Sequence, residues 1–252
     1  MIPQILLDKA ETPDGGKELR LYQHDKDFLI SVGNVQLMSS RTHESEEALA
    51  HLALERIEIK ENTRVLIGGL GMGFTLRAAL DVLPAKARVV VAELIPAVVK
   101  WNRGPLADLA GHALEDSRVE VHEVDAAKMI RHGQGRYDAI LLDVDNGPAG
   151  LSRTGNHWFY GLSGLHAMLA ALRPDGVLAL WSAGPDVEFT RRMEIVGFDV
   201  ESIRVRARAG KKGAHHVIWI AKKNRNPAPP ASSSEIREGR NRKASRDHWK
   251  SR

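Results

Sequence analysis

Most of this 252-residue chain alternates between short apolar runs and segments in which apolar residues recur every three or four positions. The apolar runs predict strands at 64–68, 88–93, 118–123, 137–143 and 176–181. The wider spacing predicts helices at 44–58, 73–82, 96–103, 126–132, 161–172 and 186–196. Strands that alternate with helices in this way form a mostly parallel sheet with helices on both faces, so the predicted fold class is α/β.

The pattern changes at both ends of this core. Residues 18–23 and 27–38 predict strands joined at Asp25–Lys26, which together form a small β unit. Two final strands, at 199–206 and 214–221, are joined by a loop too short for a crossover connection. We therefore expect these last two strands to be antiparallel.

Residues 222–252 have a composition of their own. They hold ten Lys or Arg against three Asp or Glu, and few apolar residues, so they lack the surface needed to fold. Subtracting them from 36 basic and 32 acidic residues leaves 26 and 29, so the formal charge of +4 comes from this segment. Its contact with nucleic acid is an alternative to a merely solvated end. The predicted units are an N-terminal β unit at 1–43, an α/β domain at 44–222 and a disordered basic tail at 223–252.

A glycine-rich turn separates the predicted strand at 64–68 from the next helix. Gly69, Gly71 and Gly73 lie in the sequence GLGMGFTLR. Glycine lets a ligand approach the backbone closely, and the start of the following helix offers unpaired N–H groups. Glu93 ends the next strand, twenty residues after Gly73. An acid at this distance binds ribose hydroxyls in nucleotide-binding βαβ units, so the sequence predicts a nucleoside site.

The spacing of the glycines narrows the type of nucleoside. The third glycine comes one residue too early for the dinucleotide motif Gly-x-Gly-x-x-Gly, and the Gly-Lys-Ser/Thr of a phosphate-binding loop is absent. Gly-x-Gly-x-Gly followed by a strand-ending Glu is the pattern of transferases that bind S-adenosylmethionine. We therefore expect S-adenosylmethionine, or its decarboxylated form, as the cofactor.

Further acids follow the ends of the third and fourth predicted strands. Asp125 comes just after the third strand, and Asp143 ends the fourth, with Asp145 two residues beyond. Because parallel strands end at one rim of a sheet, where ligands bind, we expect Glu93 at the ribose, Asp125 at the adenine amino group and Asp143 at the sulfonium end or the acceptor. Asp143 and Asp145 are the candidate catalytic residues, since a carboxylate can accept the proton of an acceptor. The alternative for each acid alone is a helix cap or an exposed turn residue.

Candidate acceptor-binding residues lie in the loop after these acids. This loop, 146–160, is glycine-rich at its start and aromatic at its end. Asn146, Trp158 and Tyr160 are therefore candidate substrate contacts in a segment able to cover the site. The alternative is that Trp158 and Tyr160 pack the loop against the sheet.

Composition excludes several classes of protein. The chain has no cysteine, which excludes disulfides and thiolate metal sites. His43 and His51 lie about two helical turns apart, too far to share an ion, and His215 and His216 alternate across a strand. No apolar run reaches membrane-spanning length, and the first residues lack the features of a secretory signal. We expect a cytoplasmic protein that binds no metal.

Residues 28–221 resemble the spermidine synthase-like branch of the class I S-adenosylmethionine-dependent methyltransferase superfamily. The glycine motif of that branch reads GGGDGGTLR, against GLGMGFTLR here, and its strand-ending acids match Glu93, Asp125 and Asp143. Gln36 falls where the branch has a glutamine after its N-terminal β unit, which makes it a further candidate substrate contact. The resemblance implies a Rossmann-like seven-stranded fold with a C-terminal antiparallel pair, a small-molecule acceptor and a homodimer.

The chain also departs from that branch. Aminopropyltransferases of the branch carry an Asp in the glycine motif, where this chain has Met72. They carry Asp-Glu and Tyr-His-Glu where this chain has Arg41-Thr42 and Ser45-Glu46-Glu47. A cationic diamine needs carboxylates around it, so we expect methyl transfer to a small molecule. Polyamine aminopropyl transfer and a non-catalytic nucleoside-binding role are the alternatives.

Overall fold

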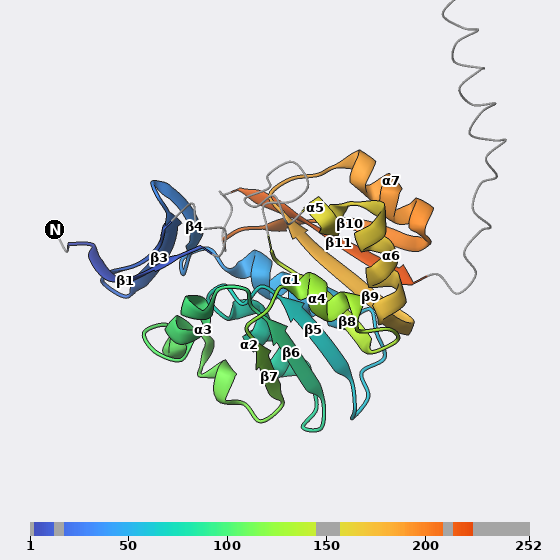
Figure 1. The fold of residues 1–252 in the computed structure, drawn as a ribbon, viewed down its shortest axis with the longest axis horizontal. Coiled ribbons are helices and arrows are strands. Elements are labelled where there is room, and N and C mark those ends of the chain that lie inside the picture. The colour runs from blue at the N-terminus through green and yellow to red at the C-terminus, as the bar shows by residue number, and fades with distance from the viewer. Residues whose placement is uncertain (1–2, 13–17, 145–156, 209–213, 224–252) are drawn as a thin grey trace, which may run out of the picture.

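The main body of the protein is a seven-stranded sheet with the strand order β10-β11-β9-β8-β5-β6-β7 (Figure 1). The computed structural model describes residues 3–12, 18–144, 157–208 and 214–223. The parallel strands are β5 (Arg64–Gly68), β6 (Arg88–Ala92), β7 (Val119–His122), β8 (Tyr137–Leu142) and β9 (Leu172–Ser182). All five strands were predicted from the apolar runs, and β5 has the predicted bounds.

The last two strands form the antiparallel pair that the short connection predicted. They are β10 (Phe198–Arg206) and β11 (His215–Lys223). β11 lies between β10 and β9 and is antiparallel to both. The start of β11 therefore lies beside the carboxyl end of β9, where Val217 pairs with Ser182.

Helices cover both faces of this sheet. One face carries α1 (Glu44–Leu54), α2 (Phe74–Val82), α3 (Pro96–Asn102) and the short 3₁₀ helices η1 (Ala107–Ala110) and η2 (Ala113–Glu115); the other carries α4 (Ala126–Arg131), α5 (His157–Tyr160), α6 (Leu162–Ala171) and α7 (Val187–Val196). Val65 and Ile67 pack into the core on the first face, and Leu66 between them packs into the core on the second. This explains the unbroken apolar runs, because a strand buried on both faces has no polar positions.

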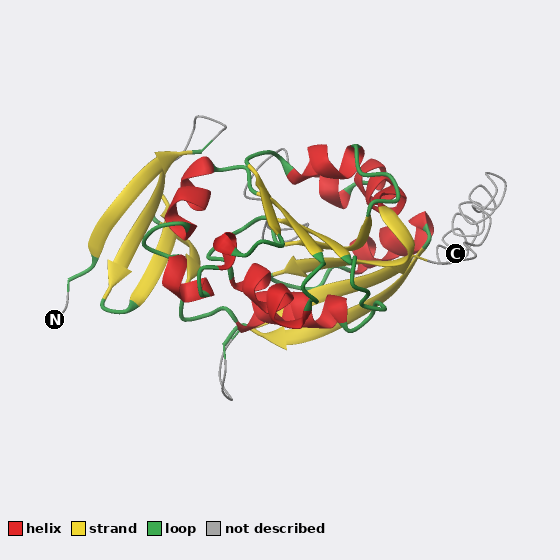
Figure 2. Cartoon of the chain, turned by 90° about the horizontal axis from the view of Figure 1, so that it is seen from below, coloured by secondary structure: helices red, strands yellow, loops and turns green. Residues whose placement is uncertain are grey.

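A separate four-stranded antiparallel sheet precedes the main body, in the order β1-β2-β3-β4, and lies at one end of the molecule (Figure 2). Its strands are β1 (Ile5–Glu11), β2 (Glu18–His24), β3 (Asp27–Val32) and β4 (Val35–Ser39). Asp25 adopts a left-handed conformation in the turn between β2 and β3, as expected for the joint at Asp25–Lys26. The sequence did not predict β1, because most of its side chains are exposed and show no apolar alternation.

The remaining differences from the predicted elements are at their boundaries. α1 ends at Leu54 rather than at 58, and β9 begins at Leu172 rather than at 176. The short helix α5 and the two 3₁₀ helices were not predicted. The basic tail at 224–252 and the loop at 209–213 lie outside the described residues. None of the helices in the described ranges is long and apolar enough to cross a membrane.

Asp8 connects the N-terminal sheet to the main body. Its carboxylate accepts hydrogen bonds from the Trp101 indole N–H and the Lys100 ammonium of α3, each at 2.9 Å. These bonds lower the pKa of Asp8 from 3.8 to about 2, with the Trp101 contribution largest. Trp101 itself is buried, so its N–H depends on Asp8 for a partner.

We predict that Asp8→Ala lowers the free energy of unfolding by about 1–3 kcal/mol at pH 7, because it leaves a buried indole N–H unpaired. Asp8→Asn should cost less, since its amide oxygen still accepts from the indole. A carboxyl with a lowered pKa stabilises the fold above its unfolded pKa and loses that effect as the pH falls. The stability gap between wild type and Asp8→Asn should therefore close between pH 4 and pH 2. Denaturant unfolding at several pH values measures it, with Glu11→Ala on the same strand as the control. If the difference in unfolding free energy between wild type and Asp8→Asn does not change with pH, the charge of Asp8 does not stabilise its contact with Trp101 and Lys100.

Candidate active site

The backbone between β5 and α2 turns through conformations that only glycine adopts easily. Gly69, Gly71 and Gly73 have φ angles of 88°, 55° and 86°. A Cβ at Gly69 would overlap the main-chain oxygen of Asp143. Glycine at this position thus lets the end of β8 lie directly against the turn after β5.

Glu93 holds this turn in place. Its carboxylate accepts hydrogen bonds from the Leu70 N–H and the Ile95 N–H, each at 2.8 Å. Burial raises the pKa of Glu93 despite these bonds. A carboxylate has about four acceptor sites, so Glu93 can fix the turn and still accept hydrogen bonds from a ligand.

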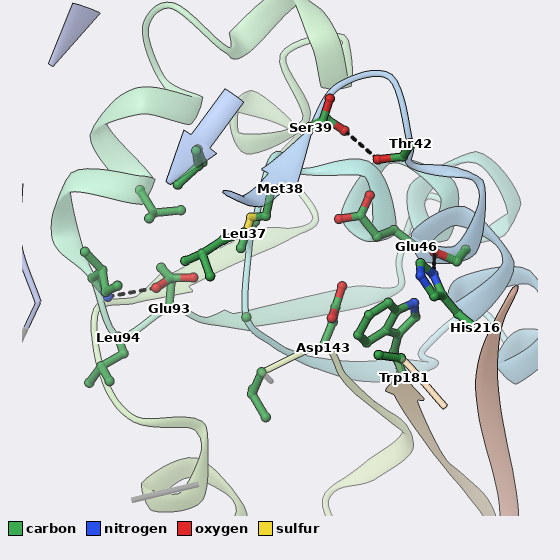
Figure 3. A pocket seen from close by; sticks show the side chains of 18 of the residues that line it. Leu37, Met38, Ser39, Thr42, Glu46, Glu93, Leu94, Asp143, Trp181 and His216 are labelled. Atoms are coloured by element: carbon green, nitrogen blue, oxygen red, sulfur yellow. Dashed lines mark hydrogen bonds between the residues drawn. The ribbon is translucent and has the colours of Figure 1, made fainter. Parts of the chain in front are cut away.

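A pocket of about 490 Å³ opens beside this turn at the carboxyl rim of the sheet (Figure 3). Residues from the N-terminal sheet, α1, the glycine turn, the ends of β6, β8 and β9, and the start of β11 line it. The polar side chains in this lining belong to Gln36, Ser39, Thr42, Ser45, Glu46, Glu93, Asp125, Asp143, Trp181 and His216. The described lining contains no Lys or Arg.

Two carboxylates point into this pocket from different elements. Figure 3 shows Asp143, just after β8, and Glu46, on α1, both projecting into the open space. Burial raises the pKa of Asp143 from 3.8 to about 7. Burial, and then the charge of Asp143, raise the pKa of Glu46 well above its usual value. In the part of the chain that the structure describes, no side chain forms a hydrogen bond or ion pair with either carboxylate.

A third group of side chains closes the pocket next to Glu46. The Nδ1 atom of His216 lies 3.0 Å from the Ser45 hydroxyl oxygen. The His216 ring also meets the Trp181 ring edge-on, with 4.5 Å between the centroids. The start of β11 thus contributes an oriented imidazole to the pocket.

Most of the residues proposed from the sequence meet in this pocket. Gln36, Glu93, Asp125 and Asp143 line it, together with Gly69 and Gly71. Asp125 also caps α4, accepting a hydrogen bond from the Ala127 N–H at 2.8 Å. Asp125 can therefore cap helix α4 and still contact a ligand in the pocket.

The structure differs from the expectation at three of the proposed residues. Gly73 lies outside the pocket lining, and its missing side chain instead makes room for Ala110 and Asn102. Tyr160 is buried against Phe189, and Trp158 packs under Arg131.

The positions of Trp158 and Tyr160 outside the pocket lining have a simple cause. Residues 157–160 form helix α5, so consecutive side chains point in different directions, and Phe159 faces the pocket rather than Trp158 or Tyr160. The other proposed residues, Asp145 and Asn146, lie outside the described residues.

The sequence did not predict that Ser45, Glu46 and His216 line the pocket. Glu44, Glu46 and Glu47 share the first turn of α1, a pattern typical of a solvated helix face. In the sequence, Ser45-Glu46-Glu47 correspond to the Tyr-His-Glu motif of the related branch. This correspondence was the one sign in the sequence that Ser45 and Glu46 could belong to the site. No cluster of metal-ligating side chains occurs within the described ranges.

The fold and the pocket define the class of protein. A mostly parallel sheet with a glycine turn after its first strand and an acid after its second is the nucleoside-binding fold of S-adenosylmethionine-dependent transferases. A sequence model of the spermine/spermidine synthase domain matches residues 42–194, more than half of the chain. The chain therefore belongs to the spermine/spermidine synthase family.

Curated relatives agree with this assignment. The polyamine aminopropyltransferase of Oceanobacillus iheyensis is 31% identical over 67% of this chain and 32% of its own length. Polyamine aminopropyltransferase 1 of Streptomyces coelicolor is 31% identical over 72% of this chain and 31% of its own length. The chain thus spans about a third of the length of these two relatives.

Solved structures share the fold. The spermidine synthase of Thermotoga maritima superposes with a TM-score of 0.69 at 17% identity, covering 92% of this chain and 77% of that chain. A probable spermidine synthase of Corynebacterium glutamicum gives a TM-score of 0.58, also at 17% identity, over 86% of this chain and 80% of that chain. The seven-stranded sheet and the N-terminal four-stranded sheet are thus those of a spermidine synthase-like fold.

We predict that Glu93→Ala weakens the binding of methylthioadenosine about tenfold or more, since a hydrogen bond to a charged group contributes about 1.5–3 kcal/mol. Isothermal titration calorimetry measures the affinity, and Glu120→Ala, an exposed acid on the next strand, is the control. Because Glu93 also holds Leu70 and Ile95, the variant should melt at a lower temperature than the control. An affinity within twofold of wild type would rule out Glu93 as a nucleoside contact.

Proposed function

We propose that this chain transfers an aminopropyl group from decarboxylated S-adenosylmethionine to a polyamine-type amine acceptor. The observation that carries the proposal is the pair of partly buried carboxylates, Glu46 and Asp143, in a pocket whose described lining has no Lys or Arg to neutralise them. The family and the curated relatives support the same activity. Because the chain spans only part of those relatives, the activity is proposed here rather than transferred from them.

The electrostatics of the pair favour a cationic ligand. Desolvation in the pocket raises the pKa of both carboxyls, and the charge of Asp143 raises that of Glu46 further. An ammonium group between them reverses both effects and forms charge-assisted hydrogen bonds. Decarboxylated S-adenosylmethionine and a diamine both present such a group. S-adenosylmethionine adds a carboxylate, which the same pair would repel.

This reasoning changes the order of the hypotheses drawn from the sequence. Methyl transfer was preferred there because the acids of a diamine site were missing at their usual positions. Glu46 supplies an acid from α1, and its Oε1 atom lies 3.8 Å from the position that a Cβ on Gly71 would take. The glycine turn therefore has an acid beside it even though Met72 does not provide one.

Methyl transfer remains the second candidate because of Met72. Its side chain is 1% exposed and packs into the core, so the glycine turn itself carries no carboxylate toward a bound donor. A donor that keeps its carboxylate meets less repulsion there than it would with an Asp at this position.

The homodimer implied by the resemblance stays a prediction.

The reaction is a direct displacement that needs positioning more than covalent chemistry. The lone pair of the acceptor nitrogen forms the new N–C bond, the C–S bond breaks, and its electron pair stays on sulfur, which leaves neutral methylthioadenosine. In the proposed arrangement Glu93 and Asp125 hold the nucleoside, and Asp143 and Glu46 bind the ammonium groups of donor and acceptor, which places the attacking nitrogen in line with the C–S bond. That nitrogen gives up a proton before its lone pair attacks. The enclosed pocket keeps water from the reacting carbon.

We predict that wild type releases methylthioadenosine from decarboxylated S-adenosylmethionine and putrescine. Asp143→Asn should lower kcat/KM by about a hundredfold and Glu46→Gln by about tenfold or more, as expected when a buried ammonium loses a charged partner. Glu47→Gln is the matched control, since Glu47 lies on the same turn but pairs with His43 outside the pocket lining. Chromatography of the nucleoside product measures the rates.

The same assay compares the two donors. Release of S-adenosylhomocysteine from S-adenosylmethionine, with no methylthioadenosine from the decarboxylated donor, would establish methyl transfer instead. Equal rates for Glu46→Gln and Glu47→Gln would show that Glu46 does not bind the substrates.

A further inference from the structure

His216 occupies the pocket as an oriented base that the reaction described so far does not use. It follows His215 on β11, and alternation along the strand puts the two rings on opposite faces. His215 is exposed, whereas His216 is half-buried and lines the pocket. The antiparallel direction of β11 is what brings its first residues to the rim where β9 ends.

Two neighbours fix the orientation of this ring. The Ser45 side chain is 2% exposed, and its hydroxyl oxygen lies 3.0 Å from His216 Nδ1. Trp181 packs edge-on against the ring from β9. When the Nδ1–H donates to Ser45, the other nitrogen, Nε2, carries the basic lone pair. No described residue forms a hydrogen bond with Nε2.

A second observation also indicates a polar occupant at this position. The Trp181 indole N–H is buried without an acceptor in the described part of the chain, although Trp181 lines the same pocket. A buried donor without a partner is rare in folded proteins and indicates a missing ligand or water. Figure 3 shows Trp181 between Asp143 and His216. A substrate amine held by the two carboxylates would therefore lie beside the Trp181 and His216 rings.

We propose that His216, oriented by Ser45, accepts the proton of the acceptor's attacking nitrogen; this inference rests on the proposed aminopropyl transfer. A protonated amine has no lone pair and cannot attack. The N–H proton of the primary ammonium moves to Nε2, and the freed lone pair forms the N–C bond as the C–S bond breaks. The product leaves as a secondary ammonium, and the imidazolium later returns its proton to solvent.

The charges around His216 suit this role in both of its states. Burial, and then the neighbouring His215, lower the pKa of His216, so the ring is neutral and one of its nitrogens has a free lone pair when the acceptor arrives. Glu46 on α1 lies next to the ring and Asp143 after β8 lies on the far side of Trp181, so both negative charges favour the imidazolium once it forms. In the proposed tautomer the Nδ1–H donates to the Ser45 oxygen in both states.

The test measures aminopropyl transfer from decarboxylated S-adenosylmethionine to putrescine across pH 6 to 10 in full-length chains. His216→Gln keeps the size and polarity of the side chain but cannot take a proton. We expect it to lower kcat by about 10²–10⁴-fold near pH 7, the usual contribution of a general base, with KM for putrescine changed less than threefold. Its rate should recover at high pH, where the amine loses its proton unaided. Ser45→Ala should show a smaller loss with the same recovery.

The matched control is His51→Gln, an exposed histidine in the last turn of α1 and outside the pocket lining, which should keep kcat within twofold. Calorimetric binding of decarboxylated S-adenosylmethionine to each variant reports on the integrity of the pocket. If His216→Gln keeps the wild-type kcat and pH profile, the proton-accepting role is overturned while aminopropyl transfer stands. If wild type itself transfers no aminopropyl group, the proposed function fails and this inference fails with it.

Discussion

The site depends on two carboxylates, Asp143 and Glu46, that share one pocket, and no Lys or Arg occurs in the part of its lining that the structure describes. Removing a carboxylate from water is costly unless it is paired, and Asp143 and Glu46 also face each other. Desolvation raises the pKa of Asp143 to about 7, and desolvation followed by the charge of Asp143 raises the pKa of Glu46. Such a pair is unfavourable in the empty protein and favourable around an ammonium group, so the proposed cationic substrates would supply the missing charge.

The topology of the sheet explains how these groups come together. β5 and β8 are parallel neighbours, which brings the glycine turn and Asp143 to the same rim, and the absence of a Cβ at Gly69 lets them touch. Glu93 arrives from β6 on the other side of the turn and fixes it through Leu70. β11 is antiparallel to its neighbours, so it begins at the rim where the parallel strands end. One pocket can thus hold a nucleoside on the β6 side and amines on the β9 side.

Much of the core could be predicted from the sequence because its strands are buried on both faces and read as unbroken apolar runs. The acids at the strand ends were found by the same logic, since parallel strands share a rim. Glu46 could not be found this way, because its place among Glu44 and Glu47 suggests a solvated helix face. Alternation put His215 and His216 on opposite faces of their strand, but the sequence does not say which face meets the pocket or that β11 lies between β10 and β9. The sequence placed Trp158 and Tyr160 in a loop and left open whether they contact substrate or pack against the sheet; helix α5 forms there and puts Phe159 in the pocket lining instead.

Proton release on binding tests the central claim most directly. Titrating decarboxylated S-adenosylmethionine into the protein at pH 7, in buffers of different ionisation enthalpy, counts the protons released. A carboxyl with a pKa of about 7 is partly protonated in the empty pocket, and a bound ammonium lowers that pKa, so its proton leaves. We predict release of a substantial fraction of a proton with the cationic donor. Uncharged methylthioadenosine should release far less, and the double variant Glu46→Gln/Asp143→Asn almost none. Equal proton counts for the cationic and the uncharged nucleoside would contradict the account.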